Sequence, residues 1–343
     1  MMRGVVALLL TVAVWLHGDL FGSLGVQEDA EPVRLIYDTD MGNDVDDAMA
    51  LAVIHALQER GECRLLAVTV SKDNFYAAAY CDLLNHYYGR PGIPIGIVRN
   101  GPTPLDGRYV RQVCEAWVQG RLRYARSLNR PGEVEEATPL LRRTLAGEPD
   151  QSVVMVQVGF STNLARLLDS PPDRYSPLPG RDLAARKIRL LSMVAGSFGR
   201  PGPKDGREYN VYKDLPSARK LFDAWPTPIV VSAYEVGMAI RYPGERMRRE
   251  DGAAGGHPVR EAYRLYVPNL PDRPTWDLTS VLYGVRPGRD DFRVSEPGEV
   301  ILDPVGRTRF EPGGHGRHRH LKIDQRQVPR IRQLLVELVE HTP

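Results

Sequence analysis

The chain has little cysteine and almost no net charge. Three of its 343 residues are cysteines, Cys63, Cys81 and Cys114, and none of their spacings is a metal motif. Cys63 and Cys81 stand among apolar residues, so we expect buried, unreactive thiols and no disulfide framework. The formal net charge of +2 argues against a protein that binds nucleic acid through electrostatic attraction.

The motifs of several common enzyme classes are absent. No G-x-x-x-x-G-K-[ST] or G-x-G-x-x-G segment follows a predicted strand, so neither a P-loop nor an ordinary dinucleotide site is supported. The segment GFSTN (159–163) lacks the last glycine of a G-x-S-x-G nucleophile elbow. An EF-hand loop that began at Asp38 would need glycine and glutamate where Asn43 and Met49 stand. A D-x-D-x-[TV] phosphatase motif would need threonine or valine at Gly42.

The first 31 residues differ from the rest of the chain. Arg3 precedes a mostly apolar stretch from Val5 to Leu16, and polar, glycine-containing sequence follows. This is the layout of a secretory signal, and the apolar stretch is shorter than the roughly 20 residues that span a bilayer. We therefore predict a signal peptide or N-terminal anchor over 1–31 and export to the periplasm or the extracellular space. No other contact with a membrane is expected.

After residue 32, short apolar runs alternate with helical patterns. The predicted strands are 33–37, 64–70, 93–98, 152–158, 188–195 and 228–233. The predicted helices are 46–58, 75–88, 138–146, 162–169, 214–222 and a last one that begins near Val328. Alternation of this kind predicts an α/β fold with an open, mostly parallel Rossmann-like sheet and helices on both faces. No long linker interrupts it, so we expect one domain over 32–343.

The most unusual segment is YDTDMGNDVDDAMAL (37–51), which holds five aspartates within ten residues: Asp38, Asp40, Asp44, Asp46 and Asp47. They stand between a predicted strand and a predicted helix, at the sheet edge where open α/β proteins bind ligands. A solvated acidic turn is one interpretation. The other is a hard cation such as Ca²⁺, which would relieve the repulsion among the carboxylates.

Five segments, in this order along the chain, resemble the nucleoside hydrolases, which are inosine–uridine-preferring N-ribohydrolases. The segments are DTDMGNDVDDAMAL, AVTVSKDN, VQVGFSTNLARLL, REYNVYKDLPSARKLF and TWDLTSVLYGVRP. The first matches the family pattern D-x-D-x-G…D-D with two extra residues before the last aspartate pair, a variant associated with a bacterial branch. Together the five segments cover most of residues 33–287.

The resemblance implies a calcium-dependent enzyme that hydrolyses the N-glycosidic bond of a ribonucleoside into free base and ribose. It implies four calcium ligands: the side chains of Asp40, Asp47 and Asp277 and the backbone carbonyl of Val158. Asp40 would also be the general base on a metal-bound water. The implied substrate contacts are Asp46, Asn74, Met193, Glu208 and Asn210. The partner would be a small ribosyl compound, and a homo-oligomer is compatible with the family.

Some of these residues also have plain structural interpretations. Asn74 could cap the helix that follows it, Asp277 could simply begin a helix, and Met193 stands in an apolar strand that favours the core. The two-residue expansion leaves the role of Asp44 open.

One departure from the family concerns the leaving base. The best-studied branch has a histidine before the last metal-ligating aspartate, and Trp276 stands there in this chain. Another donor, such as His257, or stacking on an aromatic ring would then have to assist the base.

The HGRHRH segment (315–320) is interpreted as a solvated basic strand. Two alternatives follow: a hydrolase of another ribosyl compound, and a non-catalytic calcium- or sugar-binding relative of the same fold.

Overall fold

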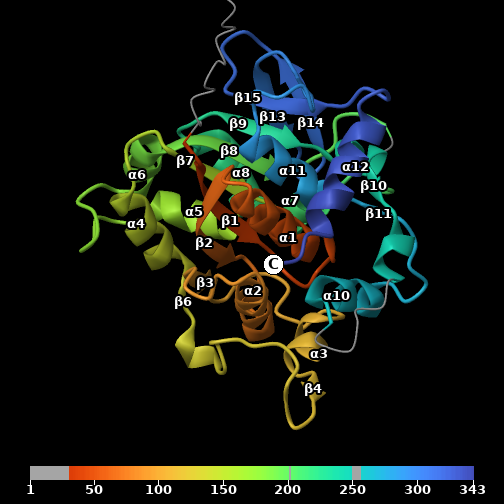
Figure 1. Cartoon of the computed structure of the whole chain (residues 1–343). Helices are drawn as coiled ribbons and strands as arrows, with labels where there is room; N and C mark the ends of the chain where they lie inside the picture. The colour runs from red at the N-terminus through yellow and green to blue at the C-terminus, as the bar shows by residue number, and fades with distance from the viewer. Residues whose placement is uncertain (1–30, 201, 249–255) are drawn as a thin grey trace, which may run out of the picture. The chain divides into compact units, whose positions relative to one another are not determined.

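The computed structural model describes residues 31–200, 202–248 and 256–343, so almost all of the predicted signal peptide or anchor (1–31) lies outside the described residues (Figure 1). Residues Pro32–Pro343 form one compact unit. None of the helices in the described ranges combines the length and the apolar character that crossing a membrane requires. All three cysteines are free and buried, which confirms the prediction of buried thiols.

A large, mostly parallel sheet lies at the centre of this unit. Its parallel strands include β1 (Val33–Thr39), β2 (Cys63–Val70), β3 (Ile95–Ile97), β6 (Glu135–Glu136), β7 (Val153–Gln157), β8 (Ile188–Val194) and β9 (Ile229–Ser232). Along the sheet they follow the order β9-β8-β7-β1-β2-β3-β6. The chain thus moves outward from β1 through β2 and β3, and later returns to the other side of β1 with β7. The gap between the ends of β1 and β7 is the topological switch point, where such sheets bind ligands.

The C-terminal region extends the sheet beyond β9. Strand β15 (His318–Lys322) pairs parallel with β9, and β13 (Gly298–Leu302), β14 (Thr308–Pro312) and β12 (Arg293–Val294) add antiparallel pairs. The interpretation of 315–320 as a solvated strand is therefore only half right. It is a strand, but His318 is buried and its Nδ1 accepts a hydrogen bond of 3.0 Å from the backbone N–H of Val300.

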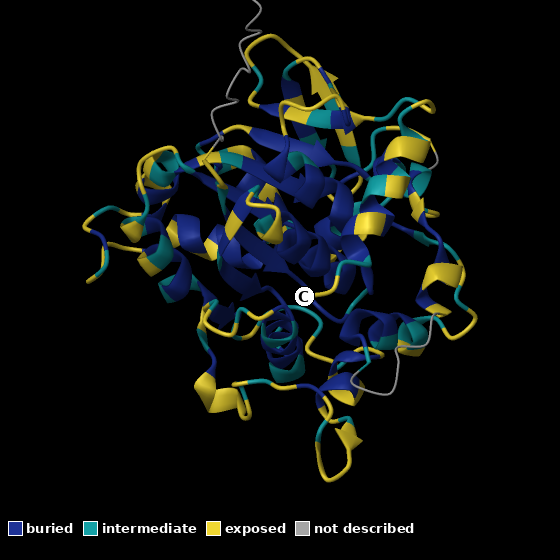
Figure 2. Cartoon of the chain, in the orientation of Figure 1, coloured by how far each residue is buried: buried dark blue, intermediate teal, exposed yellow. Residues whose placement is uncertain are grey.

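Helices cover both faces of the sheet, as predicted. On one face lie α1 (Asp46–Glu59), α2 (Phe75–Tyr87), α11 (Trp276–Val285) and α12 (Val328–Val339); on the other lie α4 (Ala137–Gly147), α5 (Thr162–Asp169), α6 (Gly180–Lys187) and α8 (Leu215–Ala224). Successive side chains of a strand point to opposite faces. Leu35 and Tyr37 of β1 accordingly pack in the first core and Ile36 in the second. Both faces of the central strands are buried, whereas exposed residues gather in the peripheral loops (Figure 2).

Shorter elements complete the chain. They are β4 (Trp117–Val118), β5 (Arg121–Leu122), β10 (Arg241–Tyr242), β11 (Arg273–Pro274), α3 (Val110–Cys114), α7 (Tyr209–Lys213), α9 (Tyr234–Ala239), α10 (Pro258–Tyr266) and two short 3₁₀ helices (Pro131–Glu133 and Gly244–Arg248).

Two glycines allow the backbone to turn tightly and pack closely at the switch point. Gly42 has φ +103°, a conformation that other residues rarely adopt, and it lies in the turn in which the N–H of Asn43 donates to the carbonyl of Asp40. Gly159 follows β7, and a Cβ there would lie 2.7 Å from the carbonyl carbon of Thr39 and overlap the backbone nitrogen of Asp40. The loops after β1 and β7 can therefore touch only because Gly159 has no side chain.

The variant Gly159→Ala should lower the free energy of unfolding by about 1–3 kcal/mol, because the added methyl group must push apart two packed backbone segments. Denaturant unfolding followed by circular dichroism measures this. Gly147→Ala is the matched control: a Cβ at Gly147 meets nothing within 4 Å, so its stability should equal or exceed that of the wild type. Equal stability of wild type and Gly159→Ala would show that the two loops do not pack as described.

Candidate active site

A cavity of about 730 Å³ opens at the carboxyl edge of the sheet, beside the switch point. Its lining comes from the loops after β1 and β7, from the end of β8, from residues 203–212, from the starts of α1, α9 and α11, and from the end of α10. One part of the wall is acidic and contains Asp40, Asp44, Asp46, Asp47 and Asp277. Another part is aromatic and contains Tyr209, Tyr212, Tyr234, Tyr266 and Trp276. The cavity thus combines a charged region with a region suited to a flat, apolar group.

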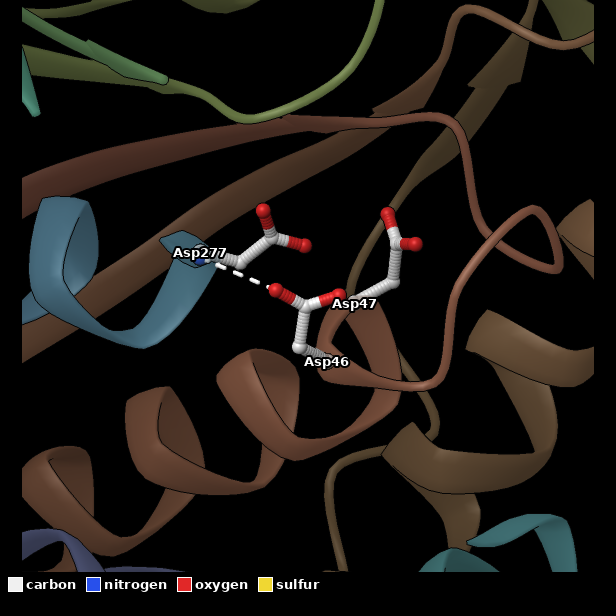
Figure 3. Close-up of side chains that lie close together, drawn as sticks. All are labelled: Asp46, Asp47 and Asp277. Atoms are coloured by element: carbon white, nitrogen blue, oxygen red, sulfur yellow. Dashed lines mark hydrogen bonds between the residues drawn. The ribbon is translucent and has the colours of Figure 1, made fainter. Parts of the chain in front are cut away.

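Three carboxylates converge in the acidic region. Asp46 and Asp47 begin α1, Asp277 lies in the first turn of α11, and one oxygen from each lies within 4.8 Å of the others (Figure 3). The two helix starts are joined directly, because Asp46 Oδ2 accepts a hydrogen bond of 3.3 Å from the backbone N–H of Asp277. Such a group of buried oxygens can hold a metal ion.

The protein environment of these three aspartates opposes their negative charge. Burial raises the pKa of Asp46, Asp47 and Asp277 well above the usual value, and the neighbouring carboxylates raise it further. The hydroxyl of Thr39 donates to Asp47 and lowers its pKa in part. A cation among the three oxygens would remove the repulsion, so the donor set fits a hard metal ion that prefers oxygen ligands.

Asp40 lies beside this group without being part of it. Its Oδ2 accepts a hydrogen bond of 2.6 Å from the side-chain amide of Asn43. Burial raises the pKa of Asp40 to about 6, and the contacts with Asn43 and the charge of Lys72 work against that increase. The three carboxylates that the structure groups are therefore Asp46, Asp47 and Asp277, whereas the family resemblance implies Asp40, Asp47 and Asp277.

Two cationic side chains in this region were missed from sequence alone. Lys72 is 1% exposed, and its Nζ donates a hydrogen bond of 2.7 Å to Asn43 Oδ1. Arg273 forms an ion pair with Asp44, and its guanidinium lies 5.2 Å from the centre of the Tyr266 ring. Lys72 could have been found, since it follows β2, the neighbour of β1. No local sequence pattern marks Arg273 as a residue of this site.

The sequence left the role of Asp44 open. In the structure Asp44 lies at the cavity wall and forms an ion pair with Arg273. Lys72 and Arg273 contact the loop that carries four of the five aspartates, and Lys204 and Arg207 line the same cavity, so carboxylates outnumber cations at this wall.

Val158, Glu208 and Asn210 form the side of the cavity next to the acidic region. Asn210 donates from Nδ2 to the carbonyl of Val158 at 2.7 Å. Glu208 caps α7 and accepts from the backbone N–H groups of Asn210 (2.9 Å) and Val211 (3.0 Å). Burial raises the pKa of Glu208 to about 7. The structure therefore brings together these three residues and the aspartates, as the resemblance implies.

Three other residues singled out in the sequence do not line the cavity. Asn74 caps α2 by accepting from the N–H of Ala77 at 3.1 Å, and its amide donates to Asp106 at 2.8 Å. Met193 packs in the hydrophobic core, and the next residue, Val194, lines the cavity instead. His257 is buried, with its ring 5.1 Å from that of Tyr87.

Trp276 belongs to the aromatic wall. Its indole N–H donates to the backbone carbonyl of Tyr234 at 2.9 Å, and the two rings lie 5.3 Å apart. The N–H is therefore already used within the protein. Trp276 offers a ligand a flat surface and no proton donor.

Comparisons with known proteins identify a family that matches this chain. The model of the family described as inosine-uridine preferring nucleoside hydrolase matches residues 35–303. A comparison with curated proteins found no match.

Solved structures share the fold at low sequence identity. A plant nucleoside hydrolase is 19% identical with a TM-score of 0.65, over 90% of this chain and 99% of that one. A purine-preferring ribonucleoside hydrolase from Gardnerella vaginalis is 15% identical with a TM-score of 0.68, over 89% and 98%. The type III effector protein XopQ, solved in complex with adenosine diphosphate ribose, is 17% identical with a TM-score of 0.61, over 90% and 93%.

Without metal, the protein should become more stable as the pH falls from about 8 to about 5. Burial raises the pKa of Asp38 to about 7, of Asp40 to about 6 and of Glu208 to about 7. Carboxyl groups in the unfolded chain titrate near pH ~4. Between these values the folded chain binds more protons than the unfolded chain, so its free energy of unfolding decreases as the pH rises.

Denaturant unfolding in the presence of a chelator tests this pH dependence. Saturating calcium should flatten it, because a bound cation stabilises the ionised carboxylates. Stability that instead rises with pH across this range in chelator would contradict the burial of ionisable carboxyls.

Proposed function

The chain belongs to the inosine-uridine preferring nucleoside hydrolase family, whose members are glycosidases that act on N-glycosyl compounds, and from this we propose that it hydrolyses a ribonucleoside with the help of a bound calcium ion. The observation that carries the proposal is the convergence of Asp46, Asp47 and Asp277 within 4.8 Å at the wall of a cavity that also has an aromatic region. Acidic oxygens suit a metal ion and the hydroxyls of a sugar, and aromatic rings suit a base.

The calcium ion would be held by oxygen ligands alone. Of the converging group, Asp47 and Asp277 would supply two ligands, and the carbonyl of Val158 and Asp40 from the neighbouring turn would supply the others, as the family resemblance implies. Asp46, the third member of the group, would then be left for the ribose. Ca²⁺ is preferred over softer metals because the cavity wall offers carboxylates and a carbonyl, and the described part of the acidic wall contains no cysteine or histidine. When bound, a metal ion of this kind lowers the pKa of a water molecule in contact with it.

We assign the role of general base to Asp40. It is buried beside the carboxylate group, and without metal burial raises the pKa of its carboxyl to about 6, which makes it a stronger base than an exposed aspartate. The proton comes from the attacking water, and the carboxylate holds it while the glycosidic bond breaks. An oxocarbenium-like sugar forms in such a step, and the surrounding negative charge stabilises it.

The ribose hydroxyls would be held by Asp46, Glu208 and Asn210, which combine acceptors and an amide donor at the cavity wall. Asn74 and Met193 would support the cavity wall without lining it. Asn74 ties the start of α2 to residues 104–106, and Met193 supports the strand that carries Val194. For the base, Trp276, Tyr234 and Tyr209 offer stacking surfaces, since the indole N–H is already bonded.

A ribosyl compound that carries a phosphate is the second candidate substrate. Lys204 and Arg207 line the same cavity, and a cavity of about 730 Å³ is in the range that holds drug-sized ligands. The structural neighbour XopQ was solved in complex with adenosine diphosphate ribose. Arg207 pairs with Asp205, which reduces the positive charge at this position and makes the nucleoside the first choice.

The protein should release reducing sugar from purine or pyrimidine ribonucleosides, with calcium required and chelator inhibitory. A panel of ribonucleosides, ribonucleoside 5′-phosphates and adenosine diphosphate ribose, each with calcium and with chelator, separates the candidates. Release from the phosphorylated compounds alone would favour the second substrate. A protein that contains calcium, binds a nucleoside in a melting assay and releases no sugar would be a binding relative and would disprove the enzymatic proposal.

Asp40→Asn should lower kcat by roughly 10²- to 10⁴-fold, because an amide cannot accept the proton of the attacking water. In chelator-treated protein the melting temperature should stay at or above that of the wild type, since the substitution removes a buried charge and keeps the shape. Asp169→Asn is the control, because Asp169 is an exposed residue paired with Lys220. Steady-state kinetics with wild-type rates in Asp40→Asn would disprove the assignment of the base.

A further inference from the structure

Lys72 is a buried cation without a role in the reaction described above. Lysine is almost never fully buried unless it is paired, yet Lys72 is only 1% exposed. The charges of Asp40, Asp47 and Asp106 favour its ionised form and oppose the effect of burial. The hydrogen bond found for its Nζ goes to a neutral side chain, Asn43.

Asn43 connects Lys72 to Asp40. Its Oδ1 accepts from Lys72 Nζ at 2.7 Å, and its Nδ2 donates to Asp40 Oδ2 at 2.6 Å and to Thr103 Oγ1 at 3.0 Å. An ammonium group can only donate hydrogen bonds, so the amide must turn its oxygen toward Lys72. Its NH₂ group then faces Asp40. Rotation of the amide by half a turn would place two oxygens against each other at Asp40 and two donors against each other at Lys72.

The turn at Gly42 places Asn43 for this connection. Asn43 follows Gly42, whose φ of +103° turns the backbone, and the N–H of Asn43 donates to the carbonyl of Asp40 at 3.2 Å. The turn therefore brings the side chain of Asn43 back to the carboxylate of Asp40. Lys72 reaches the same position from the end of β2, the strand that pairs with β1.

We propose that Lys72 is a positioning residue for the hydrolysis, which acts through Asn43 to fix one oxygen of Asp40 and leaves the other oxygen to accept the proton from water. The inference rests on the proposed function of Asp40 as the base. Lys72 itself touches neither the water nor the sugar. Its removal should therefore lower kcat and leave the KM for the nucleoside nearly unchanged, because the residues assigned to the ribose stay in place.

A double-mutant cycle on the calcium-loaded enzyme tests whether Lys72 acts through Asn43. Lys72→Met removes the donor with little change in side-chain length, and Asn43→Ala removes the connecting amide. Each single variant should lower kcat roughly 10- to 100-fold, with the KM within about twofold of wild type. The double variant should be no slower than the slower single variant, because both changes break the same connection. Lys220→Met, at an exposed position on α8, is the matched control and should keep the wild-type kcat.

A second measurement needs no turnover. In chelator-treated protein with ¹⁵N-labelled asparagine, the side-chain NH₂ signals of Asn43 are identified by their loss in Asn43→Ala. In the wild type they should exchange slowly with solvent and be shifted by the bond to a carboxylate. In Lys72→Met they should exchange rapidly and lose that shift, whereas in Lys220→Met they should be unchanged.

Additive losses of kcat in the double variant would overturn the proposal, because Lys72 would then act directly through its charge or through the fold. Unchanged Asn43 signals in Lys72→Met would also overturn it. If the wild type hydrolyses none of the compounds in the panel, the proposed function fails, and the NMR experiment alone decides whether Lys72 orients Asn43.

Discussion

The repulsion among five aspartates at one cavity wall is the constraint on which the rest of this site depends. Asp40, Asp44, Asp46, Asp47 and Asp277 share a buried region, and Lys72 and Arg273 are too few to balance them. The fold holds these charges together by tying down the loop that carries four of them. The hydroxyl of Tyr109 accepts from the N–H of Gly42 at 3.1 Å and donates to the carbonyl of Asp44 at 2.8 Å. A loop fixed in this way cannot spread its carboxylates apart, so bound protons, which the raised pKa values favour, or a bound cation must relieve the repulsion.

The position of the cluster follows from the order of the strands. The loops after β1 and β7 face each other where the direction of winding reverses, and α1 begins at the same point. The starts of α1 and α11 both point their backbone N–H groups toward the acidic region, which favours negative charge there. The direct bond from the N–H of Asp277 to Asp46 is one example of that effect. The sheet edge at which other open α/β proteins bind nucleotides thus carries a group of buried carboxylates here.

Two different parts of the cavity suit two different parts of a ligand. Its acidic and amide groups suit the hydroxyls of a ribose, and its aromatic wall suits a base. Trp276 stands where the best-studied relatives have an acid, and its bonded N–H leaves only the face of the ring for a ligand. Under the proposed function, affinity for the leaving base would depend on stacking, which discriminates weakly among bases. Discrimination at the ribose should be sharper, because a missing hydroxyl leaves buried polar groups without a partner.

The sequence by itself determined the parallel α/β fold, the acidic turn after β1 and the family, because these depend on local periodicity and on contiguous motifs. Through the family resemblance it also pointed to Glu208 and Asn210, which lie two positions apart in one motif. The tertiary structure alone decided that Asp46 joins Asp47 and Asp277, that Arg273 neutralises Asp44, and that Asn74 and Met193 stay out of the cavity. Asp46 and Asp277 are 231 positions apart and meet only because α11 packs against α1. Which side chains share a charged site depends on such packing between distant helices, and no local pattern in the chain records it.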